Sequence, residues 1–192
     1  RIVRDVAIER GKSSFGTLLD IVIADELKTI LWPTPQDDDA ESWRMRAELW
    51  QDGRAMIGGS DAGAHLDRMC GAPYPTRWLA DCIRGRKLVP VEFAVKMMTS
   101  QPAKLFGLVD RGELREGACA DVVVFNPDEI GSEDAMLVTD LPGNSSRLTA
   151  GSFGVKRVLV NGVTIVENGV ANGAVPGTVL KSGKDTYTVP AR

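Results

Sequence analysis

The segment from Gly58 to His65 contains the residue types that could do chemistry, namely a pair of glycines, Ser60, Asp61 and a histidine. Asp61 follows directly after the apolar run at residues 55–59, which predicts a short buried strand. Barrel enzymes place catalytic groups at the carboxyl ends of such strands, and glycines let the backbone come close to a substrate. The Asp61 carboxylate could orient and deprotonate a metal-bound water, or it could simply cap the following turn; the pattern alone leaves both open.

His65 is the only histidine in the chain, so a mechanism that needs several imidazoles cannot be completed by these residues. A catalytic zinc usually takes three protein ligands, which one histidine cannot supply. A contact with the substrate or with the groups around a metal, and an ordinary hydrogen-bonded loop position, both remain open for His65. Cys70, Cys82 and Cys119 lack the spacing of a zinc site or a disulfide framework. They predict three reduced thiols in a cytoplasmic protein.

The elements that must position Asp61 alternate between helix and strand in the first half of the chain. Apolar residues at a 3.6-residue period predict helices that begin after a cap at Ser13 or Ser14 and after residue 39, and further helices around residues 76–85 and 90–106. Compact apolar runs predict strands at residues 29–32 and 55–59. The three aspartates at residues 37–39 are expected to be a solvated helix start, because consecutive carboxylates cannot converge as metal ligands.

The second half of the chain has the pattern of a small β-module. Residues 119–125 form an almost continuous apolar run that predicts a strand. Residues 155–166 predict a hairpin around Asn161-Gly162, because that dipeptide supplies the two left-handed positions of a tight turn. The tail at residues 169–192 is rich in Gly, Ser and Thr, and we expect it to cover the β-region.

Length and composition fit a globular protein and exclude several classes. The 192 residues are 43% hydrophobic and 26% charged, which is enough apolar content to bury a core. A formal net charge of -3 gives no support for a nucleic-acid surface, and no apolar run approaches the length of a membrane span. The chain begins with Arg rather than Met, so we expect it to be cut from a longer protein.

The change of character near residue 110 predicts two parts, residues 1–110 with the helix–strand units and residues 111–192 with the β-module. A complete eight-stranded α/β barrel needs about 250 residues. The first part can therefore supply only two or three units of such a barrel.

Three groups of residues give the chain a family resemblance. Residues 58–67 and 73–77 resemble the last barrel strand and the following loop of N-acyl-D-amino-acid deacylases. Residues 98–108 look like the helix that closes amidohydrolase barrels. The segments Arg111-Gly112-Glu113-Leu114, Ala120-Asp121-Val122-Val123-Val124-Phe125 and Val158-Leu159-Val160-Asn161-Gly162 are similar to the first strand and the hairpin of that superfamily's β-module. The resemblance extends over about residues 10–180.

This resemblance implies an α/β fold, the C-terminal units of a (β/α)8 barrel followed by part of a small β-sandwich module. It implies metal-dependent hydrolysis of the amide of N-acyl-D-amino acids. Asp61 would be the catalytic acid–base residue at the metal, and Arg77 would hold the substrate carboxylate, for which a guanidinium is suited. Arg77 could equally be a solvated residue at a helix start. His65 would lie at the barrel mouth, near the substrate.

The family's cofactor is zinc, and its other ligands, including a His-x-His on the first strand, have no counterpart in this chain. They would lie before Arg1, so the chain alone is expected to bind no zinc tightly and to be inactive. Two alternatives stay open, another amidohydrolase acting on cyclic amides or dipeptides, and a non-catalytic fragment that acts through its β-module. The expected partners are a small N-acyl amino acid and further copies of the chain, with no nucleic acid or membrane.

Overall fold

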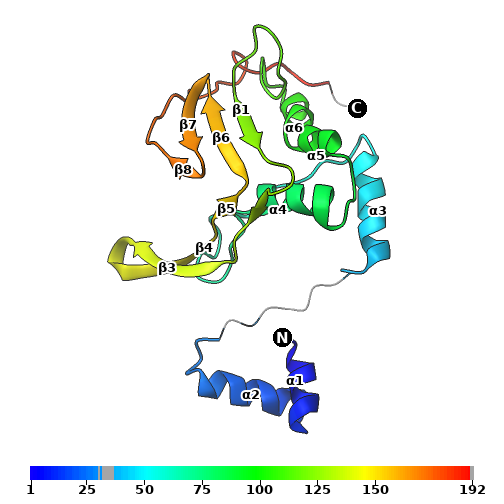
Figure 1. Cartoon of the computed structure of the whole chain (residues 1–192), viewed down its shortest axis with the longest axis vertical. Coiled ribbons are helices and arrows are strands. Elements are labelled where there is room, and N and C mark those ends of the chain that lie inside the picture. Colours follow the sequence, from blue (N-terminus) through cyan, green and yellow to red (C-terminus); the bar gives the residue numbers. More distant parts are fainter. Residues whose placement is uncertain (30, 32–36, 191–192) are drawn as a thin grey trace. The chain divides into compact units, whose positions relative to one another are not determined.

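The computed structural model describes residues 1–29, 31 and 37–190 (Figure 1). The chain divides into two compact units, residues 1–42 and 43–192. The first unit is a pair of helices, α1 (Val3–Arg10) and α2 (Ser14–Ala24), joined by a turn at Gly11. Ser13 caps α2 as predicted, since its hydroxyl accepts a hydrogen bond from the Gly16 amide at 3.1 Å. The predicted strand at residues 29–32 lies partly outside the described residues.

The second unit begins with helices. α3 (Ala40–Gln51) starts at the end of the first unit, and α4 (Tyr74–Ala80) continues into a π-helical turn, Asp81–Gly85. The predicted helix around residues 90–106 consists of two helices, α5 (Val91–Met98) and α6 (Ser100–Leu105). Pro102 explains the break, because it has no N–H for the Met98 carbonyl and its ring would clash there. The break places Pro102 in the first turn of α6, where a helix needs no such donor.

The strand predicted at residues 55–59 is not formed. These residues are irregular, and the described part of the chain contains no strand before Val122. A buried parallel strand is stabilised by hydrogen bonds to neighbouring strands, and no described segment supplies one here. The apolar run therefore has the composition of a strand but lacks the neighbouring strand whose hydrogen bonds would stabilise it.

The β-region follows the prediction more closely. β1 (Val122–Phe125), β6 (Val155–Val160), β7 (Val163–Glu167) and β8 (Val170–Ala171) form an antiparallel sheet in the order β1-β6-β7-β8. The β6–β7 turn is at Asn161 and Gly162, with φ of 48° and 79°, so the predicted hairpin is confirmed. Two short pairs complete the region, β2 (Gly131–Ser132) with β5 (Ser152–Phe153) and β3 (Met136–Leu141) with β4 (Ser145–Thr149).

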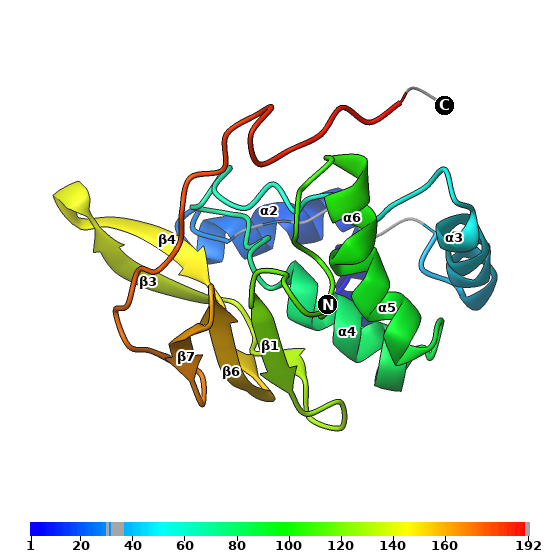
Figure 2. The ribbon, with the colours of Figure 1, turned by 90° about the horizontal axis from the view of Figure 1, so that it is seen from above.

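One apolar core joins the helices to the β-region. Its buried members come mainly from the helical segment, and Ile130 comes from the β-region; they are Leu79, Cys82, Val89, Ala94 and Ile130. Figure 2 shows α4, α5 and α6 beside the β-strands, with the tail passing over them. The tail is tied to the end of α6, because the Tyr187 amide donates to the Gly107 carbonyl at 2.8 Å. None of the described helices is long and apolar enough to cross a membrane.

Candidate active-site loop

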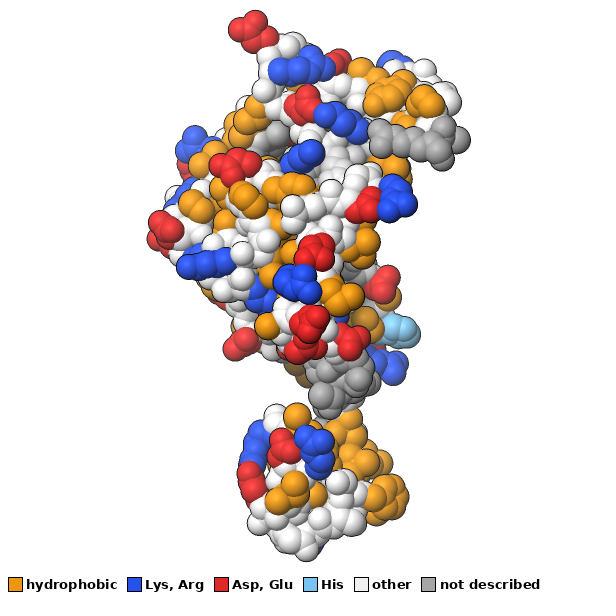
Figure 3. Space-filling model, turned by 90° about the vertical axis from the view of Figure 1, so that its right-hand side faces the viewer, with side chains coloured by type: hydrophobic (Ala, Val, Ile, Leu, Met, Phe, Trp, Pro, Cys, Tyr) orange, Lys and Arg blue, Asp and Glu red, His pale blue; other side chains and the backbone are white. Residues whose placement is uncertain are grey.

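Asp61 and His65 lie on one exposed loop, residues 58–71, which we call the site loop. Both residues have left-handed backbone angles, with φ of 51° for Asp61 and 47° for His65. Asp and His are among the non-glycine residues that adopt this region most often. The Asp61 carbonyl accepts from the Ala64 amide at 2.9 Å, and the His65 carbonyl accepts from the Met69 amide at 2.8 Å. Two successive turns thus expose both side chains, and the single imidazole is on the surface in Figure 3.

Contacts from distant parts of the chain hold the site loop and the segment before it. At the base of the loop, Gly71 lies so close to Ser60 that an added Cβ would be 2.1 Å from the Ser60 carbonyl oxygen. Further along, the Leu66 carbonyl accepts from the Leu148 amide of β4 at 2.7 Å. These contacts join the loop to itself and to the β3–β4 hairpin.

Arg77 and Arg84 show two uses of a guanidinium in the same helical segment. Arg84 donates to the carbonyl oxygens of Pro127 at 2.9 Å and Ile130 at 2.7 Å, so it links the helices to the β-region. Arg77 is exposed on α4, and its side chain has no hydrogen bond or ion pair within the residues described. A structural role is therefore assigned to Arg84, while the Arg77 guanidinium is available to bind an anion.

The three predicted site residues lie on the site loop and on the helix that follows it. Asp61 and His65 share the site loop, and Arg77 follows it on α4, but no hydrogen bond or ion pair joins them in the described parts of the chain. Sequence reasoning missed two contacts with this region, the one from the Leu148 amide and one from the Gln101 side chain, whose Nε2 donates to the Ala55 carbonyl oxygen at 2.5 Å. The only signal for Gln101 was its place in the closing-helix motif, and Leu148 uses a backbone amide that any non-proline residue could provide.

The donors present do not fit a metal ion by themselves. Across residues 1–29, 31 and 37–190, no group of three or more His, Cys, Asp or Glu side chains could hold one. Cys82 is also excluded by its environment, because burial and the nearby Asp81 carboxylate raise the pKa of its thiol to about 12. A metal binds the thiolate form, which such a pKa makes unavailable near neutral pH.

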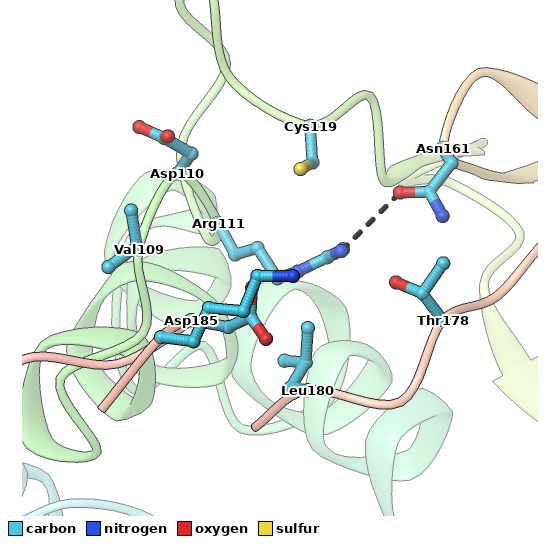
Figure 4. A pocket seen from close by; sticks show the side chains of 9 residues that line it. Val109, Asp110, Arg111, Cys119, Asn161, Thr178, Leu180 and Asp185 are labelled. Carbon is cyan, nitrogen blue, oxygen red and sulfur yellow. Dashed lines mark hydrogen bonds between the residues drawn. The ribbon is translucent and has the colours of Figure 1, made fainter. Parts of the chain in front are cut away.

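A cavity of about 380 Å³ lies elsewhere, between the end of α6, the start of β1 and the tail (Figure 4). Its lining includes Arg111, Cys119, Asn161 and Asp185, and it includes none of the predicted site residues. The Arg111 guanidinium forms an ion pair with Asp121 and donates to the Asn161 side chain at 3.4 Å. Because this cation is already paired with a carboxylate, we assign the cavity no catalytic role.

Comparison with known proteins places the chain in a family. The sequence model of the amidohydrolase family matches residues 30–166, and the chain belongs to this family. D-aminoacylase of Alcaligenes xylosoxydans xylosoxydans is 30% identical over 186 residues, which cover 94% of this chain and 34% of that protein. N-acyl-D-glutamate deacylase of the same organism is 36% identical over 115 residues, covering 57% of this chain and 22% of that protein.

A solved structure of D-aminoacylase, a protein with a binuclear metal center, matches this chain with a TM-score of 0.51 and 30% sequence identity. The match covers 91% of this chain and 33% of that structure. The chain thus spans about a fifth to a third of the length of the relatives it matches.

Proposed function

We propose that the whole protein hydrolyses the amide bond of N-acyl-D-amino acids to a carboxylate and a free D-amino acid, in a metal-dependent reaction. The match to D-aminoacylase carries this proposal, because it runs over 94% of the chain and so includes the site loop and α6. The finer fold belongs to the same proposal, with the last units of a (β/α)8 barrel at residues 1–110 and a β-module at residues 111–192. The division near residue 110 is supported by the order of elements, since the described strands all come after the α-helices, and the barrel units are supported by the match to the amidohydrolase family.

Asp61 is the proposed acid–base residue of this reaction. Its carboxylate is exposed and makes no hydrogen bond or ion pair within the described residues, so it is open to a water molecule. The carboxylate would take a proton from the attacking water and deliver it to the nitrogen of the leaving amine. General acid–base assistance of this kind contributes about 10²- to 10⁴-fold to a rate.

Arg77 is the proposed partner of the substrate carboxylate. A guanidinium binds a carboxylate through two parallel hydrogen bonds, which would fix the amino-acid end of the substrate. The exposed, unpaired guanidinium on α4 supports this role. His65 is proposed to contact the substrate from the site loop.

The metal of the whole protein is proposed to be zinc, which the family resemblance implies and which would polarise the amide carbonyl. The described residues of this chain do not form a site for it, and its further ligands are proposed to come from other parts of the whole protein. The three free cysteines support a reducing, cytoplasmic setting.

Self-association of the isolated chain is a further part of the proposal. The apolar side of α2 is open to solvent, with Phe15 69% and Ile23 71% exposed. Contiguous exposed apolar side chains favour association. We expect light scattering to show a mass above that of the monomer, which shifts toward the monomer in a Phe15→Ser, Ile23→Ser variant. A monomeric wild-type chain at high concentration would contradict this.

The enzymatic proposal is tested by comparing the whole protein with the isolated chain on N-acetyl-D-glutamate, N-acetyl-D-leucine and their L-enantiomers. The whole protein should release free D-amino acid and lose this activity with a chelator. The isolated chain should hold no stoichiometric zinc by elemental analysis and show no turnover above a metal blank. Hydrolysis of a cyclic amide or a dipeptide, without release from either D-substrate, would instead favour a different amidohydrolase.

A further inference from the structure

We propose that Gln101 is a positioning residue that holds the segment carrying Asp61. Gln101 is the second residue of α6, and its side-chain nitrogen Nε2 donates to the Ala55 carbonyl oxygen at 2.5 Å. Ala55 precedes Asp61 by six residues and begins the apolar run that leads to it. The bond spans 46 positions of sequence, so it connects Asp61's segment to a helix that is distant along the chain.

The segment between Ala55 and Asp61 is not part of a helix or strand. It lacks strand partners among the described residues, and it contains Gly58 and Gly59, whose added Cβ atoms would meet no atom within 4 Å. Consecutive glycines have the largest backbone freedom to lose on ordering. An anchor at the start of this segment therefore limits where Asp61 can lie.

A second anchor lies on the other side of Asp61. The Leu66 carbonyl, five residues after Asp61, accepts from the Leu148 amide at 2.7 Å. Asp61 is thus held between α6 on one side and β4 on the other. α6 can serve as an anchor because it is itself packed. Ala103 of α6 is buried, and it lies so close to Gly112 that an added Cβ there would be 2.7 Å from the Ala103 Cβ.

Positioning matters for an acid–base residue, because a displacement of about 1 Å can cost about 100-fold in rate. This part of the inference rests on the proposed function. The structural part, that Gln101 orders the segment, concerns this chain alone and can be measured without any substrate.

The first experiment measures backbone order by ¹⁵N relaxation in the 192-residue chain carrying Phe15→Ser and Ile23→Ser, the variant expected to shift toward the monomer. Gln101→Leu keeps a similar volume and removes the donor, and we expect order parameters at residues 56–62 to fall from the rigid range, about 0.85, toward about 0.6. Gln101→Lys, which keeps an N–H donor on a long side chain, should restore most of the order. Gln51→Leu is the matched control, because the Gln51 side chain donates to the Ala47 carbonyl within its own helix at 3.1 Å. Unchanged order in Gln101→Leu would overturn the proposal.

The second experiment uses the whole protein and its deacylase activity. Gln101→Leu should lower kcat about 10- to 100-fold with KM nearly unchanged, and Gln101→Lys should recover part of the loss. In an Asp61→Asn background, Gln101→Leu should cost nothing more, because no positioned carboxylate remains. Equal losses in both backgrounds would show that Gln101 does not act through Asp61.

The two proposals can fail separately. If the whole protein hydrolyses no N-acyl-D-amino acid, the proposed function is wrong, and the relaxation data alone decide whether Gln101 orders the segment. Should Gln101→Leu not fold, Gln101→Asn provides the same test, because its amide is one methylene too short to reach the Ala55 carbonyl.

Discussion

The site loop and the cluster of Arg111, Asp121 and Asn161 both carry family motifs, but they use their polar side chains differently. In the cluster, the Arg111 side chain is 16% exposed and forms an ion pair with Asp121. The Asp121 carboxylate also accepts a hydrogen bond from the backbone N–H of Asn161 at 2.9 Å. This carboxylate therefore joins the start of β1 to the β6–β7 turn. In the site loop, Asp61 and His65 are exposed, and their side chains make no bond within the described residues.

A family motif can contain polar residues for two different reasons, either to stabilise the fold or to carry out chemistry. A polar side chain that satisfies buried or half-buried partners is needed for the fold, and its removal leaves those partners unpaired. An exposed polar side chain without a partner, on a residue in the left-handed backbone conformation, contributes little to stability. We therefore expect such a residue to act in binding or catalysis. Substitutions at the two places should accordingly change different quantities, activity in one case and stability in the other.

The largest expected effect is on turnover, in Asp61→Asn of the whole protein. The amide keeps the size of the carboxylate but cannot carry the proton, so kcat should fall about 10²- to 10⁴-fold. The melting temperature should stay the same, because the Asp61 side chain has no described partner to lose. Steady-state kinetics and calorimetry on one preparation test both statements. Near-normal turnover would show that Asp61 is only a turn residue.

Asp121→Ala should have the opposite effect, on stability. It removes the partner of a mostly buried guanidinium and the acceptor of the Asn161 amide. Hydrogen bonds to charged groups contribute about 1.5–3 kcal/mol, so we expect a loss of about 2–3 kcal/mol in the free energy of unfolding. Urea unfolding measures it, with the exposed Asp128→Ala as control. A loss no larger than that of the control would show that the cluster is not structural.

The sequence predicted the β-region better than the site. The Asn161-Gly162 hairpin and the Ser13 cap depend on neighbours in sequence, which local patterns record well. The segment at residues 55–59 depends on strands that no described residue supplies, so its composition predicted a strand that is absent. The roles of Asp61 and His65 stay predictions, and the anchors Gln101 and Leu148 were not found. They depend on contacts between distant parts of the chain, which a single sequence does not show.

Gly71→Ala tests the base of the site loop and should have a moderate effect. The new methyl group would meet the Ser60 carbonyl oxygen at 2.1 Å, so the backbone must move. Overpacking of this kind costs about 1–3 kcal/mol, and we expect the lower half of that range because the loop is exposed. Gly59→Ala is the matched control, since its added Cβ meets nothing within 4 Å. Equal unfolding midpoints for the two variants would show that the close contact between Gly71 and the Ser60 carbonyl oxygen does not affect the free energy of unfolding.

The smallest effect is expected for Asp140→Asn on the β3–β4 hairpin, which supplies the Leu148 anchor. Hydrogen bonds from the Arg147 guanidinium, at 2.8 Å to each carboxylate oxygen, lower the pKa of Asp140. A lowered pKa in the folded state stabilises the protein above the unfolded value, about 3.9, and this contribution is lost as the pH falls through the folded value. Because the pair is exposed, its contribution is small and screened by salt. Asp140→Asn should therefore lower the melting temperature slightly at pH 7 and low salt, and the difference from wild type should shrink as the pH falls below the unfolded value and in 1 M NaCl. A difference that persists at both conditions would mean that Asp140 acts through packing and not through its charge, and this hairpin would then not show the weak contribution expected of an exposed ion pair.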